Sequence, residues 1–250
     1  MNKVRIANIY IDNLSMGECV AKIKDLIKSG SKSYIVTPNV DHIVRLQRDN
    51  EFLEAYENAE VVVADGMPII WASNFLGTPL KEKISGSDLF TELCKVSEEM
   101  EYRLFFLGAG EGVAEQAASN LKKKFKNIEI IGVYSPPFGF EKDDKENVKI
   151  REMINKRAPD ILFVGVGAPK QEKWIYKNLD MLNVKMAIGI GAAFDFAAGT
   201  IKRAPVFMQK VGLEWFWRFM HEPRRLFKRY FIDDSRFIVI LFKQMWFQKK

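Results

Sequence analysis

The sequence has little of what most metal and redox sites are built from. It contains only two cysteines, Cys19 and Cys94, and two histidines, His42 and His221, none with the spacing of a metal-ligand set. No Asp-x-Asp occurs, which is the usual means of holding a metal ion against a nucleotide-sugar diphosphate. We therefore expect reduced structural cysteines, structural histidines with His42 on a helix surface, no cofactor, and chemistry without a metal ion.

Long apolar runs are also missing. No stretch reaches the roughly 18–20 apolar residues that a membrane-spanning helix needs, and the best candidate, 237–247, is interrupted by Lys243 and Gln244. The N-terminus lacks the apolar region of a secretory signal. Neither a Walker phosphate loop nor a Gly-x-Ser-x-Gly nucleophile motif occurs. These absences predict a cytoplasmic protein that is not integral to the membrane.

Positive charge is concentrated in the last fifty residues. Residues 201–250 contain twelve Lys and Arg against four acids, a net charge of +8, whereas the whole chain is +6. Three of the five tryptophans lie there too. If Pro223 begins a helix, cations and aromatic residues take opposite sides, the cations being Arg224, Arg225, Lys228 and Arg229. This pattern favours a C-terminal helical appendage, 201–250, that contacts an anionic membrane surface or a polyphosphate. The alternative is an ordinary packing helix whose cations reach water.

Short apolar runs alternate with helical stretches through residues 1–200. The expected strands are 4–11, 33–37, 61–64, 103–107, 128–134, 161–166 and 186–189. The expected helices are 15–28, 41–59, 87–100, 112–124, 142–156 and 170–179. This alternation predicts an α/β domain, 1–200, with a mostly parallel, Rossmann-like sheet and helices on both of its faces.

Ligands of such sheets bind beyond the carboxyl ends of the strands, and several polar residues fall there. Asn39 follows one strand, where it either caps the next helix or contacts a ligand. Asp65 follows another, and Asp65-Gly66 is either a turn or a carboxylate whose pKa burial raises, which would make it a better base. Glycine-rich turns from Gly108 and from Gly165 suit a nucleotide phosphate.

Taken in order, these motifs resemble the WecG/TagA/CpsF family of glycosyltransferases (glycosyltransferase family 26). The resemblance extends over residues 1–230. It rests on Thr37-Pro38-Asn39 with Asp41-His42, Asp65-Gly66, Ile84-Ser85-Gly86-Ser87-Asp88-Leu89, Phe106-Leu107-Gly108, Pro159-Asp160-Ile161-Leu162, and the stretch from Gly165 to Glu172. It continues through Phe194-Asp195-Phe196-Ala197-Ala198-Gly199, Lys202-Arg203-Ala204-Pro205, Gly212-Leu213-Glu214-Trp215 and Glu222-Pro223-Arg224-Arg225.

The resemblance implies inverting transfer of a sugar from a UDP-sugar to a polyprenyl-diphosphate-linked sugar, on the inner face of the membrane and without a metal ion. It is strongest to the wall teichoic acid branch. That branch implies N-acetylmannosamine as the transferred sugar and undecaprenyl-diphosphate-N-acetylglucosamine as the acceptor. The chain departs from the family at Lys83, where the family more often has Arg, so a point charge replaces a bidentate phosphate contact.

The resemblance and the residues together predict roles in the site. Asp65 is the expected general base, with Thr37 and Asn39 orienting the acceptor sugar or Asp65 itself. The expected substrate ligands are Lys83, Gly86, Asp88, Gly108, Gly110, Tyr134, Gly165, Gly167, Gln171 and Asp195. Arg218, Arg225 and Lys228 of the appendage are expected to fold over the site and supply positive charge to the departing UDP.

Other interpretations stay open at this stage. The same fold can transfer a different UDP-sugar, such as glucose or N-acetylmannosaminuronate. A nucleotide-binding module that docks on membranes without turnover is a second alternative. Nucleic-acid binding fits less well, because the cations and aromatic residues of the appendage segregate to opposite helix faces. The apolar residues within 205–247 also allow self-association away from the membrane.

Overall fold

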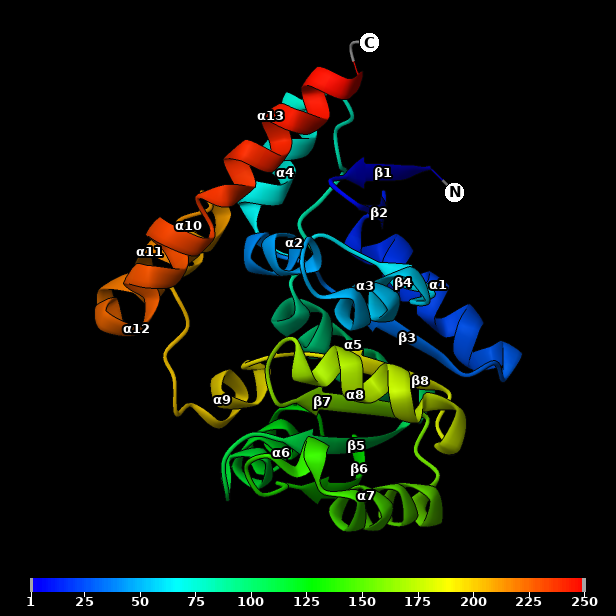
Figure 1. The fold of residues 1–250 in the computed structure, drawn as a ribbon. Helices are drawn as coiled ribbons and strands as arrows, with labels where there is room; N and C mark the ends of the chain where they lie inside the picture. The colour runs from blue at the N-terminus through cyan, green and yellow to red at the C-terminus, as the bar shows by residue number, and fades with distance from the viewer. Residues whose placement is uncertain (1, 249–250) are drawn as a thin grey trace.

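The computed structural model describes residues 2–248. At its centre lies a six-stranded sheet with the strand order β4-β3-β8-β7-β5-β6 (Figure 1). In that order the strands are β4 (Val61–Val62), β3 (Ser33–Val36), β8 (Met186–Gly189), β7 (Ile161–Gly165), β5 (Arg103–Gly108) and β6 (Glu129–Tyr134). All neighbouring strands in it are parallel, which confirms the predicted α/β sheet.

Helices cover both faces of this sheet, as expected. One face carries α1 (Met16–Ser29), α5 (Gly86–Met100), α6 (Val113–Lys124) and α9 (Ala193–Ala198). The other carries α2 (Val40–Leu46), α3 (Asn50–Glu57), α7 (Asp144–Arg157) and α8 (Lys170–Asn178), with the short 3-10 turns η1 (Phe140–Lys142) and η2 (Leu179–Met181). Side chains of β5 alternate between the two layers: Leu104 and Phe106 pack on the first, Phe105 and Leu107 on the second.

The expected first strand, 4–11, is instead an antiparallel hairpin. It consists of β1 (Lys3–Ile6) and β2 (Ile9–Asp12), which form a separate two-stranded sheet. Ala7 turns the chain with a positive φ of 56°, and the two-residue turn shifts the buried apolar positions from Val4 and Ile6 to Ile9 and Ile11. The Asp12 carboxylate, 2% exposed, accepts a hydrogen bond of 2.9 Å from the Val62 N–H. The hairpin is thereby attached to the edge strand β4.

One other local expectation was wrong, and one helix was missed. The single helix expected over 41–59 is divided into α2 and α3, because the Asp49 carboxylate caps a new helix by accepting from the Phe52 N–H at 3.1 Å. A helix that we did not expect, α4 (Met67–Phe75), begins directly after Gly66, with Pro68 in its first turn. The chain beyond Asp65 therefore turns at once into a helix at the edge of the sheet.

The C-terminal segment is helical, as predicted, and forms an arm at one end of the molecule (Figure 1). Its elements are α10 (Val206–Lys210), α11 (Glu214–His221), α12 (Pro223–Phe227), the π-helical η3 (Lys228–Asp233) and α13 (Arg236–Gln248). Arg229 does not lie with the outer cations as expected. The wider π turn directs it inward, where its Nη2 lies 3.5 Å from Asp41. Among residues 2–248, no helix is both long and apolar enough to cross a membrane.

Candidate active site

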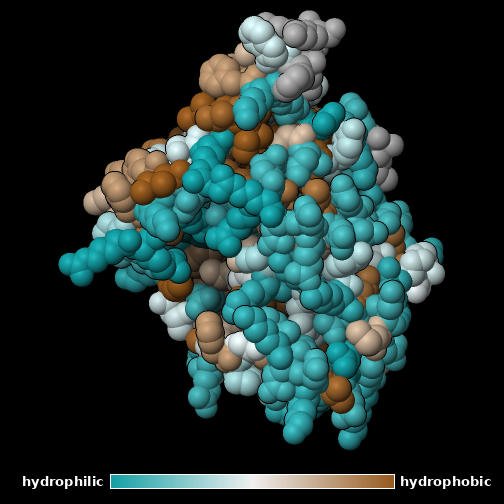
Figure 2. Space-filling view, in the orientation of Figure 1, coloured by the Kyte–Doolittle hydropathy of each residue, from teal (hydrophilic) through white to brown (hydrophobic). Residues whose placement is uncertain are grey.

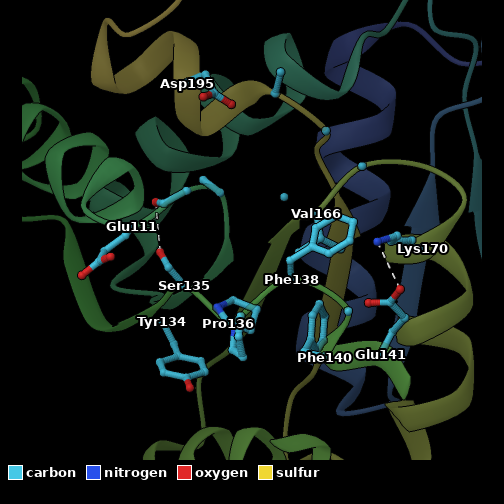
Figure 3. A pocket seen from close by; sticks show the side chains of 18 of the residues that line it. Glu111, Tyr134, Ser135, Pro136, Phe138, Phe140, Glu141, Val166, Lys170 and Asp195 are labelled. Carbon is cyan, nitrogen blue, oxygen red and sulfur yellow. Dashed lines mark hydrogen bonds and ion pairs between the residues drawn. The ribbon is translucent and has the colours of Figure 1, made fainter. Parts of the chain in front are cut away.

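A cavity of about 870 Å³ opens beyond the carboxyl ends of β5, β6, β7 and β8 (Figure 3). Its walls come from the four loops that follow these strands. Five of the predicted substrate ligands line it: Gly110, Tyr134, Gly165, Gly167 and Asp195. This is where ligands of open parallel sheets bind.

Glycines bring the β5 and β7 loops into direct contact at the floor of the cavity. A Cβ on Gly108, whose φ is +120°, would lie 2.6 Å from the Gly165 carbonyl oxygen. The next residue, Ala109, donates its N–H to that same oxygen over 2.9 Å. Gly108 is therefore required by the close approach of two loops. Its predicted contact with substrate stays a prediction.

The rim of the cavity carries groups that sequence reasoning missed. The ring of Phe138, 99% exposed, lies at the rim, and the Lys170 ammonium is 4.3 Å from its centroid. Lys170 also lies 3.1 Å from Glu141, as Figure 3 shows. An exposed aromatic ring beside a cation suits a nucleobase and a phosphate. The Ser135-Pro136-Pro137 stretch before Phe138 is a turn signal that could have indicated this loop.

Gln171 faces the interior. It is 3% exposed, and its Oε1 accepts from the backbone N–H groups of Gly167 at 3.2 Å and Gly191 at 3.1 Å. Its Nε2 donates to Glu172 at 2.8 Å. Gln171 thus ties together two loops of the cavity wall, and its role as a donor ligand stays a prediction. Burial raises the pKa of Glu172 to about 7, although the bond from Gln171 opposes this.

Asp65 lies outside the lining of the large cavity, beyond the end of β4. Its N–H donates to the Pro38 carbonyl at 2.8 Å, and the Ile84 N–H donates to the Ala64 carbonyl at 2.8 Å. These two bonds place Asp65 between the Thr37-Pro38-Asn39 loop and the segment that carries Lys83. Burial raises the pKa of Asp65 to about 6. The nearby positive charges of Arg218 and Lys83 act to lower this pKa, and the negative charges of Glu214 and Asp88 act to raise it.

Thr37 and Asn39 lie on the loop next to Asp65, as predicted. Asn39 caps α2, with its Oδ1 accepting from the His42 N–H at 3.2 Å, and a contact between its amide and a ligand stays a prediction. Thr37 is buried at 5% exposure. A Cβ on Gly86 would lie 3.3 Å from its Oγ1, so Gly86 allows α5 to approach this loop closely.

Beside Asp65 lies a group of five charged side chains from the domain and the appendage, which we call the cation cluster: Lys83, Asp88, Arg203, Glu214 and Arg218. Arg203 lies 2.6 Å from Asp88 and 3.5 Å from Glu214. Arg218 is also 3.5 Å from Glu214, and Lys83 is 3.5 Å from Asp88 and 4.0 Å from Glu214. The two carboxylates therefore hold three cations together.

Comparison with known proteins identifies the family. The model of the glycosyl transferase WecG/TagA/CpsF family matches residues 4–250. The chain belongs to this glycosyltransferase family. It is 33% identical over 193 residues to the N-acetylglucosaminyldiphosphoundecaprenol N-acetyl-beta-D-mannosaminyltransferase of Bacillus spizizenii strain W23. The aligned region covers 77% of this chain and 73% of that relative. It is 32% identical over 226 residues to the enzyme of the same name from Staphylococcus aureus strain MRSA252, covering 90% and 87%.

Membership makes this protein a glycosyltransferase and implies a sugar donor and a lipid-linked acceptor. Within residues 2–248, no three side chains of His, Cys, Asp or Glu come together in an arrangement that could hold a metal ion. The cavity and the carboxylate of Asp65 lie at the same edge of the sheet in this glycosyltransferase, beyond the carboxyl ends of its strands.

The structure separates the predicted residues of this glycosyltransferase into groups. Lys83, Asp88 and Arg218 meet beside Asp65. Lys228 and Arg225 are exposed in the outer part of the appendage, where Arg225 pairs with Glu222 at 2.6 Å. Neither of the two lines the cavity.

Three other residues were assigned differently from the sequence, or not at all. Arg203 and Glu214 each lie within a motif that carried the family resemblance, but neither was given a role. His42 is buried at 5% exposure instead of facing a helix surface. Its Nδ1 lies 2.6 Å from the Tyr56 hydroxyl, and burial lowers its pKa to about 3, so it is a neutral structural residue.

Proposed function

We propose that this glycosyltransferase moves N-acetylmannosamine from UDP-N-acetylmannosamine to undecaprenyl-diphosphate-N-acetylglucosamine, a step of wall teichoic acid linkage synthesis. The observation that carries the chemistry is Asp65, a carboxylate with a pKa raised to about 6 at the carboxyl edge of the sheet. A base with a pKa near the working pH is efficient. The two relatives named above support this choice of sugars, since both names specify the same donor sugar and acceptor.

The proposed reaction is a single displacement. The acceptor hydroxyl attacks the anomeric carbon of the donor while Asp65 takes the hydroxyl proton. The bond between that carbon and the UDP oxygen breaks, and UDP leaves with the bonding electron pair, so the anomeric centre inverts. Thr37 and Asn39 lie on the loop hydrogen-bonded to Asp65, where they can contact the acceptor sugar. Without a metal ion, protein cations and helix N-termini stabilise the departing charge, and EDTA is expected to leave turnover unchanged.

The donor is proposed to bind in the large cavity. Its polar and aromatic lining suits a nucleotide-sugar, with Phe138 available to stack on uracil and Lys170 beside it for a phosphate oxygen. Asp195 offers a carboxylate to sugar or ribose hydroxyls, and Tyr134 contributes its ring, because its hydroxyl is bound to Glu146 and Lys149. The loops from Gly108 and Gly165 leave room for the diphosphate.

The appendage is proposed to dock on the inner face of the membrane. Large apolar side chains are exposed along α10, α11 and α13, among them Phe207 at 66%, Met220 at 61% and Trp246 at 68%. Figure 2 shows this apolar surface over the C-terminal arm, with hydrophilic side chains next to it. Exposed Arg225 and Lys228 supply positive charge for anionic headgroups. Away from the membrane, the same apolar surface suits self-association.

Product identification tests this proposal. The full-length chain is incubated with a short-chain polyprenyl-diphosphate-N-acetylglucosamine and one of a panel of UDP-sugars, and the product is examined by mass spectrometry. We expect the mass of one added N-acetylhexosamine with UDP-N-acetylmannosamine and at least tenfold less product with UDP-glucose or UDP-N-acetylmannosaminuronate. Preference for another donor would replace the proposed sugar. UDP binding without turnover of any donor would indicate a nucleotide-binding module instead.

A further inference from the structure

The site has two sides, and α9 runs between them. Its consecutive residues Asp195 and Phe196 face different ways: Asp195 lines the cavity, while the ring of Phe196 lies against the cation cluster. The guanidinium carbons of Arg218 and Arg203 are 5.2 and 5.9 Å from the Phe196 ring centroid. The cavity wall and the cation cluster are therefore adjacent but distinct parts of the site.

The cation cluster lies on the Asp65 side. Lys83 immediately precedes Ile84, whose N–H is bonded to the Ala64 carbonyl, so the backbone itself places Lys83 next to Asp65. The cavity reaches the loops after β8, β7, β5 and β6, whereas Asp65 follows β4. β4 and β8 are two strand spacings apart, or roughly 10 Å, and the loop after β8 leads into α9. The cations thus lie beside the base on one side of α9, and the cavity lies on the other side.

The cluster contains more cations than carboxylates. Three cations share two carboxylates, a balance of +1 before the neighbouring Asp65 is counted. The Nη2 of Arg203 pairs with Asp88 at 2.6 Å, whereas its buried Nε, 3.5 Å from Glu214, makes no hydrogen bond within residues 2–248. Guanidinium groups form paired, charge-assisted hydrogen bonds with phosphate oxygens. The chemistry of the cluster is that of a site for a diphosphate.

Two diphosphates take part in the proposed reaction, one in the donor and one in the acceptor, and the geometry distinguishes them. In an inverting displacement the leaving group departs on the face of the anomeric carbon opposite to the attacking hydroxyl and its base. Cations that surround Asp65 therefore lie on the acceptor side. We propose that the cation cluster binds the diphosphate of the lipid-linked acceptor, an inference that rests on the proposed inverting transfer. It differs from the expectation that Arg218 serves the departing UDP.

The surroundings of the cluster suit a prenyl chain attached to that diphosphate. Arg203 lies three residues before the start of α10, whose Val206 and Phe207 are 64% and 66% exposed. The turn between α10 and α11 is seated on α4, since a Cβ on Gly212 would lie 2.8 Å from Met67. A diphosphate in the cluster thus has Asp65 on one side, for the sugar hydroxyl, and apolar helices on the other, for the lipid.

Binding measurements on the full-length chain test the assignment. Farnesyl diphosphate is the probe for the acceptor diphosphate, farnesol is the control without phosphate, and UDP is the probe for the donor site. We expect farnesyl diphosphate and UDP to bind the wild-type protein at the same time, each leaving the dissociation constant of the other unchanged within about twofold. Mutual exclusion, or no tighter binding of farnesyl diphosphate than of farnesol, would overturn the assignment.

Variants give a second readout. Arg218→Gln and Lys83→Gln each remove one charge-assisted contact. Each variant is expected to bind farnesyl diphosphate about tenfold or more weakly, and to raise KM for a polyprenyl-diphosphate acceptor by a similar factor. UDP affinity should change less than about twofold in both. Arg48→Gln, which removes an exposed arginine of the α2–α3 turn, is the matched control and should change none of these values.

A loss of UDP affinity as large as the loss for farnesyl diphosphate would overturn the assignment, as would variants that bind both normally. Lys83 lies in the domain and Arg218 in the appendage, so a folding defect in one variant leaves the other informative, and melting curves identify it. The binding arms require no particular donor sugar. A wrong donor sugar, or failed turnover, would therefore count against the proposed function and leave the assignment of the diphosphate to be judged by binding.

Discussion

The backbone N–H of Ala7, in the turn of the N-terminal hairpin, donates to the side-chain Oε1 of Gln244 in α13 over 2.6 Å. The Nε2 of Gln244 donates in turn to the carbonyl of Arg5 at 2.9 Å. The last helix is therefore joined to the first strands of the chain. It also buries Phe237, which is 6% exposed and belongs to the same core cluster as the hairpin.

Because of this attachment, we expect Gln244→Ala to lower the free energy of unfolding by about 1 kcal/mol, as two partly exposed hydrogen bonds are lost. The melting temperature of the full-length chain should fall by a few degrees. Lys243→Ala, an exposed change one residue away, is the control and should have little effect. Equal melting temperatures for the Gln244 variant and the wild type would show that α13 is not held by the hairpin.

Removing residues 201–250 should also eliminate transferase activity.

Asp65→Asn should separate activity from stability. An amide of the same shape cannot take the acceptor proton, so we expect kcat to fall by about 10²–10⁴-fold, with UDP affinity preserved. At pH 8 the variant should be more stable than the wild type, by about 1–3 kcal/mol, because folding raises the pKa of the carboxyl from 3.8 to about 6 and the charged form is disfavoured by burial.

The sign of that stability difference depends on pH. A folded-state pKa above the unfolded value favours folding at low pH, and the advantage is lost as the pH rises through about 6. The free energy of unfolding of Asp65→Asn should therefore equal that of the wild type at pH 4 and exceed it most above pH 6. Thermal unfolding at several pH values measures this, and a variant that is less stable at pH 8 would contradict the burial of the charge.

The pH dependence of the wild-type reaction follows from the same carboxyl group. Only the carboxylate form of Asp65 accepts a proton, so kcat/KM should fall about tenfold per pH unit below about pH 6. Steady-state UDP release between pH 4.5 and 8 provides the measurement. The residual activity of Asp65→Asn should lack this inflection, and an unchanged profile in that variant would exclude Asp65 as the base.

Glu172 offers a test of the wall behind the cavity. It is 1% exposed, its Oε2 has no hydrogen-bond partner within the described residues, and burial raises its pKa from 4.5 to about 7. Its contribution to stability therefore falls as the pH rises towards 7. Glu172→Gln should have a higher free energy of unfolding than the wild type at pH 8, by up to about 3 kcal/mol, and an equal one at pH 4.5, as measured by thermal unfolding. A destabilised variant at pH 8 would mean that the charge has a partner.

The parallel sheet was predictable because its signals are local. Apolar runs such as 103–107 and 186–189 are bounded by glycine turns and helical periodicity, and the structure places strands there. The hairpin at Ala7 and the break at Asp49 were missed for a common reason. In each case a very short segment changes the direction of the chain: a two-residue turn at Ala7, and a single capping residue at Asp49.

The site was predictable only as a set of strand ends. Asp65, Thr37 and Asn39 were recognised because parallel strands all end at one edge, so residues after β3 and β4 had to be neighbours. Arg203, Glu214 and Phe138 could not be given roles in this way. They come from the appendage and from a long loop, and their positions depend on contacts with residues far away in the chain.

The sequence alone determined the α/β sheet and the basic, aromatic C-terminal segment, because periodicity, turn chemistry and charge are properties of neighbouring residues. Its motifs also carried the resemblance to a glycosyltransferase family. Only the tertiary structure decided that Lys83 and Arg218 share Glu214 beside Asp65, and that Gln171 is directed inward to hold two loops. Such pairings depend on which side chains meet after the sheet closes and the appendage packs against it.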